Sequence, residues 1–146
     1  KHLWPQDKTA RARARSVCAE MHSGFGALRS ACPMNIEASL PDIGALALRD
    51  KPGVRADLNR LVTMWSELLA QHGGPMLFGQ FSIADAYFAP VVFRFNTYGV
   101  KCSPVVASYV KAMLAHPSMQ QWIADSRAEP QVVDHEEPEF IYEKQA

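Results

Sequence analysis

Apolar residues recur every three or four positions along most of this chain, the spacing that places them on one face of an α-helix. The strict alternation that marks a half-buried strand is missing. The first such segment covers residues 6–31, and its apolar face comprises Ala10, Ala14, Val17, Met21, Phe25 and Leu28. Gly24 and Gly26 predict a bend or a close helix contact in this helix, and Pro33 ends it.

The remaining helices follow a segment rich in breakers. Residues 33–51 contain Pro41 and Gly44, so we expect a linker-like loop with at most one helical turn near residues 43–48. Four further helices are predicted, at residues 52–71, 84–95, 104–115 and 118–127. The second of these is hydrophobic nearly all round, which indicates a helix buried at the centre of a bundle.

The start of that central helix carries a clear local signal. Ser82 is followed three positions later by Asp85, the pattern of a capping box. In this motif the side chain of each residue accepts a hydrogen bond from the backbone N–H of the other. Ser82 and Asp85 are therefore predicted to be structural.

Together these patterns predict an all-α bundle of about five helices in one domain. The expected organisation is a linker at residues 1–5, a helical domain at residues 6–128 and an acidic tail at residues 129–146. A chain of 146 residues is long enough to build its own core.

The composition excludes several classes of function. Fifteen basic and fifteen acidic side chains cancel to zero formal charge, which argues against a nucleic-acid binder and against an anionic membrane surface as partner. No apolar run approaches the length needed to span a bilayer. Cys18, Cys32 and Cys102 form no metal-binding pattern, so we expect no metal and interpret them as free thiols of a cytoplasmic protein.

One flank of the first predicted helix carries side chains that could bind a ligand or take part in a reaction. Spacings of three and four bring together Arg11, Arg15, Cys18, His22, Phe25 and Arg29. One interpretation is a solvated basic stripe that pairs with neighbouring carboxylates. The other is a wall of a binding cleft, and the residues alone leave both open.

Two stretches of the sequence resemble a known family. Residues 81–90 (FSIADAYFAP) resemble the capping box and buried helix of the glutathione transferase C-terminal domain. In that family an apolar residue just before the box forms a hydrophobic staple, so the resemblance implies that Phe81 packs on Ala86. Leu3, Trp4 and Pro5, followed by an Arg/Ala-rich helix, resemble the interdomain linker and first helix of its bacterial members. The resemblance covers residues 3–127.

The resemblance implies a function for the whole protein. Family members carry a thioredoxin-like N-terminal domain that supplies the catalytic residue and most of the glutathione site. No βαβ pattern of such a domain occurs here, so we expect it to be missing, no catalytic residue to be present, and the chain to be inactive alone.

Site residues and partners follow from the same resemblance. Arg15 and His22 would hold anionic glutathione or polarise a small hydrophobic electrophile, while Met21 and Phe25 would wall the substrate pocket. The domain would also contribute contacts to a homodimer. The alternative is a non-catalytic protein-interaction module of the same fold.

Overall fold

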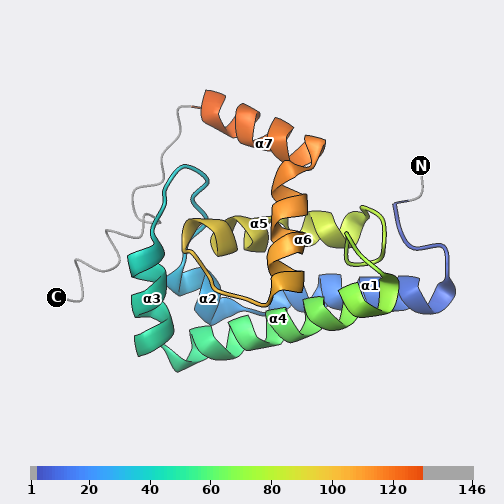
Figure 1. Ribbon diagram of the computed structural model, residues 1–146, viewed down its shortest axis with the longest axis horizontal. Coiled ribbons are helices and arrows are strands. Elements are labelled where there is room, and N and C mark those ends of the chain that lie inside the picture. Colours follow the sequence, from blue (N-terminus) through green and yellow to red (C-terminus); the bar gives the residue numbers. More distant parts are fainter. Residues whose placement is uncertain (1–2, 130–146) are drawn as a thin grey trace.

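The computed structural model describes residues 3–129, and within them every regular element is an α-helix (Figure 1). The all-α prediction is confirmed, although this described part of the chain forms seven helices rather than about five. They are α1 (Lys8–Ser23), α2 (Gly26–Ala31), α3 (Pro41–Asp50), α4 (Pro52–His72), α5 (Ile83–Thr97), α6 (Pro104–Ala115) and α7 (Pro117–Ala128). Apart from Glu129, the predicted acidic tail lies outside the described residues.

The predicted first helix is two helices. Its backbone leaves the helix at Gly24, which is extended, and Phe25 takes a left-handed conformation with φ 59° before α2 begins. A positive φ is unfavourable for a bulky side chain, on the order of 1–3 kcal/mol. Here the turn directs the Phe25 ring into the main core, where it is 7% exposed, and burying such a ring offsets a cost of this size.

The second extra helix occupies the predicted loop. Pro41 stands at the first position of α3, where its missing N–H and fixed φ suit a helix, so it begins the element instead of interrupting the chain. Gly44 and Ala47 form the buried side of α3. Gly44 faces the end of α5, and an added Cβ there would lie 2.1 Å from the carbonyl oxygen of Tyr98. The prediction of a loop at residues 33–51 is therefore wrong for its second half.

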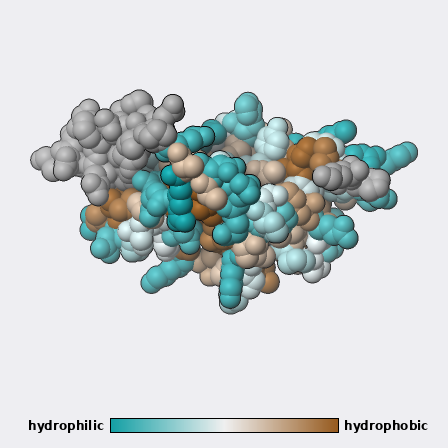
Figure 2. All heavy atoms as spheres, turned by 90° about the horizontal axis from the view of Figure 1, so that it is seen from above, coloured by the Kyte–Doolittle hydropathy of each residue, from teal (hydrophilic) through white to brown (hydrophobic). Residues whose placement is uncertain are grey.

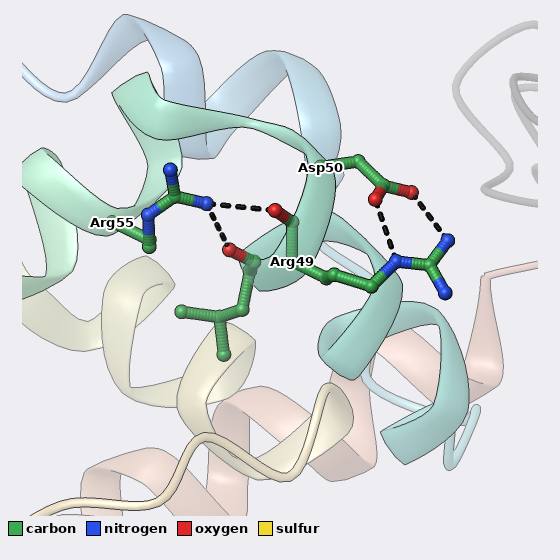
Figure 3. Close-up of polar contacts among 4 residues, drawn as sticks. Arg49, Asp50 and Arg55 are labelled. Carbon is green, nitrogen blue, oxygen red and sulfur yellow. Dashed lines mark hydrogen bonds and ion pairs between the residues drawn. The ribbon is translucent and has the colours of Figure 1, made fainter.

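A single arginine fastens the junction between α3 and α4. Arg55 donates from Nη1 to the carbonyl oxygens of Leu48 (2.6 Å) and Arg49 (2.8 Å), two groups left without helical partners at the end of α3 (Figure 3). Arg49 also forms a two-bonded ion pair with Asp50 at 2.6 and 2.8 Å. Both members of that pair belong to α3, so it does not bridge the two helices, and we assign the junction to Arg55.

The core surrounds α5. This helix packs against α1 and α6, and most of its residues are buried, as its uniform hydrophobicity predicts. Trp65 of α4 is fully buried, and its ring centroid lies 5.5 Å from that of Phe88 and 5.0 Å from those of Phe95 and Tyr109. One aromatic cluster thus connects α4, α5 and α6.

The surface carries hydrophobic residues in separate groups. On the face shown in Figure 2 they are divided by hydrophilic side chains. The large exposed ones are Leu3, Met34, Leu46, Tyr87, Val105 and Trp122. Within residues 3–129, no helix combines the length and apolar character required to cross a membrane.

The close approach at Gly44 yields a matched test. We expect Gly44→Ala to lower the free energy of unfolding by about 2 kcal/mol or more, because the new methyl group meets backbone rather than a mobile side chain. Gly26→Ala is the control, since an added Cβ there meets nothing within 4 Å; it should leave stability unchanged or raise it by up to about 1 kcal/mol. Urea denaturation measures both. Equal effects would contradict the packing of α3 on α5.

Candidate functional site

The start of the described chain is held between α1 and α5. The backbone N–H of Ile83 donates to the carbonyl oxygen of Leu3 at 2.9 Å. Trp4 packs against a small buried cluster of Ala14, Cys18 and Ala84, which lies where α1 meets α5. The entry segment is therefore fixed at the N-terminal end of α5 and alongside α1.

The structure separates the four residues predicted to bind substrate. Arg15 and His22 are exposed on α1, and a difference of seven positions places them on one face about two turns, or roughly 10 Å, apart. The Arg15 guanidinium lies 5.6 Å from the centroid of the Trp4 ring, a cation–π arrangement. Met21 is half-buried against the main core, and Phe25 lies within it.

The continuous flank inferred from spacing is thus wrong at three positions. Cys18 is 4% exposed and faces α5, because α1 turns its small residues toward that helix. Phe25 and Arg29 leave the flank because α1 ends before them, and Arg29 lies in the separate helix α2. What remains exposed on α1 is a polar face that carries Arg15 next to Trp4 and His22 about two turns further along.

No cysteine in the described residues is set up as a nucleophile. Burial, and then the negative charge of Asp85, raise the pKa of Cys18 to about 11. Burial likewise raises the pKa of Cys32 to about 11 and that of Cys102 above its usual value. All three are free thiols, and they stay protonated at neutral pH, so the thiolate that would react is scarce.

The capping box at the start of α5 is larger than its sequence pattern. Asp85 is fully buried and accepts four hydrogen bonds. Oδ2 accepts from the backbone N–H (2.9 Å) and the hydroxyl (3.2 Å) of Ser82, and Oδ1 accepts from the N–H of Leu77 (3.1 Å) and the hydroxyl of Tyr109 (3.2 Å). Ser82 Oγ in turn accepts from the N–H of Ala84 at 3.3 Å. One carboxylate therefore joins the loop before α5, the start of α5 and α6.

The predicted staple has a different partner. The ring of Phe81 stacks on that of His116, with centroids 4.0 Å apart and planes 14° apart, while Ala86 is exposed. His116 also caps α7, because its Nδ1 accepts from the N–H of Ser118 at 3.2 Å. Phe81 therefore packs against the junction between α6 and α7.

Two of these contacts, that of Tyr109 with Asp85 and that of His116 with Phe81, could not be predicted from the sequence. Tyr109 lies 24 positions after Asp85, and no spacing rule connects a helix cap to a residue so distant. A histidine before Pro117 looks like a helix stop, and it is one, but nothing local assigns it to Phe81.

The described residues contain no group of three or more His, Cys, Asp or Glu side chains placed to hold a metal ion. A cavity of about 640 Å³ lies between the end of α5, α6 and α7, and none of the four predicted substrate-binding residues lines it. The geometry therefore leaves the exposed α1 face, beside the entry segment, as the candidate site.

The buried cap can be tested against an exposed one. Asp85→Ala should lower the free energy of unfolding by about 3 kcal/mol or more, because it leaves the Tyr109 hydroxyl and the Leu77 N–H buried without their acceptor. Asp7→Ala is the matched control: Asp7 caps α1 from an exposed position, so its loss should cost about 1 kcal/mol. A smaller loss at Asp85 than at Asp7 would refute the role assigned to Asp85.

The same carboxylate predicts an unusual pH dependence. Burial raises the pKa of Asp85 above its ordinary value, more than its hydrogen bonds lower it, so the folded chain holds this proton more tightly than the unfolded chain. Its contribution to stability is then fully present below the unfolded-state pKa and is lost as pH rises through the folded-state pKa. Relative to Asp85→Asn, the wild-type chain should therefore gain free energy of unfolding as pH falls from 7 into that window. Denaturation at stepped pH measures it, and a shift in the opposite direction would contradict the assignment.

The sequence was compared with known families and proteins. No curated protein matches it significantly. Residues 10–125 match the family described as glutathione S-transferase, C-terminal domain, a match that includes α1 to α6 almost completely and most of α7. The chain therefore belongs to the glutathione S-transferase C-terminal domain family.

Proposed function

We propose that this domain forms one wall of the electrophile site in a glutathione-dependent transferase, next to a thioredoxin-like domain that binds glutathione. The observation that carries the proposal is the anchoring of Leu3 and Trp4 between α1 and α5. A domain that precedes this segment would emerge beside the exposed α1 face. Family membership supplies the chemistry, which is attack of the glutathione thiolate on an electrophile or a reduction at the expense of glutathione.

Each residue of the α1 face has a part in this proposal. Arg15 is exposed and its guanidinium can donate two parallel hydrogen bonds to a carboxylate, of which glutathione has two. Met21 is half-buried, and its flexible thioether can fit electrophiles of different shape. His22 is exposed and can donate to the developing charge on a leaving group. Phe25 supports the wall from within the core, because its 7% exposure leaves little ring surface for substrate.

The thiol chemistry belongs to the other domain in this account. Activation of glutathione needs a group that stabilises its thiolate, and the buried cysteines here do not provide one. Family resemblance extends the proposal to a bacterial homodimer. The three free thiols are in keeping with a reducing, cytoplasmic compartment.

A binding experiment on the chain itself tests the wall. With the six methionine methyl groups labelled with ¹³C, S-(2,4-dinitrophenyl)glutathione should shift the Met21 signal through the ring current of its aryl group. Met21→Leu assigns that signal, and Met113 and Met119, which are buried in α6 and α7, serve as internal controls. Glutathione without an aryl group should shift Met21 less. Shifts at the controls with none at Met21 would overturn the proposal.

A rate measurement tests the division of labour. The purified 146-residue chain, given glutathione and an aromatic chloride, should show no conjugation above the uncatalysed rate, because no group that activates the thiol has been identified in it. Steady turnover would contradict the assignment of catalysis to another domain. If both turnover and aryl binding at Met21 are absent, the alternative of an interaction module gains support.

A further inference from the structure

The cavity at the other end of α5 is independent of the α1 face. Its lining comes from the last turn of α5, the following loop, α6 and α7, and includes Phe95, Val100, Ala107, Val110, Lys111 and Leu114. In Figure 1 the loop after α5 leaves the helix at the end away from the N-terminus. Asn96 follows Ile83 by thirteen positions along α5, which places the cavity about 20 Å from the anchored entry segment. A domain preceding Leu3 is therefore not needed to complete it.

The cavity has the size and lining of a small-molecule site. A volume of about 640 Å³ lies within the range of roughly 300–1,000 Å³ found for ligand pockets. Phe95 forms a rigid part of the lining, since it is 3% exposed and its ring centroid lies 5.0 Å from that of the fully buried Trp65. Val110 and Leu114 add half-buried aliphatic surface from α6.

The charge on the lining selects the ligand class. Lys111 is the one formally charged side chain among the described lining residues, and it makes no ion pair with any residue in the range 3–129. No carboxylate from this range lines the cavity. The side-chain amide of Gln120 already donates from Nε2 to the carbonyl oxygen of Leu114 at 2.6 Å. Asn96 adds an uncharged amide to the lining, so among residues 3–129 the ammonium group of Lys111 is the charged donor that the cavity offers to a ligand.

We propose that this cavity binds a small apolar molecule that carries a single anionic group. Its hydrocarbon body lies on Phe95, Val110 and Leu114, and its carboxylate or sulfonate pairs with Lys111. The site is distinct from the electrophile site of the proposed function, so either can fail without the other.

Cys102 provides a local reporter for the test. It lines the cavity and is half-buried, whereas Cys18 and Cys32 are 4% and 2% exposed, so a maleimide should alkylate Cys102 first in the native chain. Mass spectrometry then follows the rate at this single position. We use 2-naphthoate as the anionic probe and 2-naphthalenemethanol as its uncharged counterpart. Naphthoate should slow alkylation of Cys102 at lower concentration than the alcohol does.

Variants test the charge of Lys111 and the open volume of the cavity separately. Lys111→Gln should weaken protection by naphthoate about two- to fivefold, as expected for an exposed ion pair, and leave protection by the alcohol unchanged. Ala107→Trp, at an exposed position on the lining, should abolish protection by both probes. Ala56→Trp, exposed on α4, is its matched control and should behave as wild type, with thermal unfolding reporting that all variants fold.

Three outcomes would overturn the proposal. Equal protection by the acid and the alcohol would remove the role of Lys111. Protection that survives Ala107→Trp in a folded chain would place the probes elsewhere. Absence of any protection in the full chain, whatever else occupies the cavity there, would show that no such ligand binds.

Discussion

The buried carboxylate of Asp85 joins three parts of the chain at a single point. Its four donors come from the loop before α5, from the cap of α5 and from α6. A fully buried carboxylate is costly to desolvate, and the cost is tolerable only when its oxygens are well bonded. The geometry of Ser82, Leu77 and Tyr109 is therefore determined jointly, and a shift in one of these elements leaves a buried polar group unsatisfied in another.

With its N-terminus fixed by Asp85, α5 contacts a different part of the molecule at each of its two ends. At its N-terminal end the N–H of Ile83 holds Leu3, so the same turn that contains the cap positions the entry segment beside α1. At its C-terminal end the carbonyl of Tyr98 meets Gly44 of α3, and Phe95 connects the Trp65 cluster to the cavity. The helix thus separates a polar, exposed face at one end from an apolar cavity at the other, and the two proposed sites lie on these separate surfaces.

Local signals in the sequence were sufficient for much of this fold. The periodicity and the capping box located α4 to α7 because those features depend on neighbouring residues. The turn at Phe25 depends on the core that receives its ring, and α3 depends on the surface of α5 that accepts Gly44, so neither could be inferred from spacing. The same limit applies to the site: spacing placed Arg15, Cys18 and His22 on one flank, but which residues face α5 is decided by packing.

Native-state amide hydrogen exchange tests the central role of Asp85 most directly. The N–H groups of Leu77 and Ser82 lie at or before the start of α5, outside its helical ladder, yet both donate to this buried carboxylate. We predict that they exchange only through global unfolding, with the same opening free energy and denaturant dependence as the amides in the middle of α5. Exchange of Leu77 and Ser82 through local openings, while the α5 amides stay protected, would contradict the account.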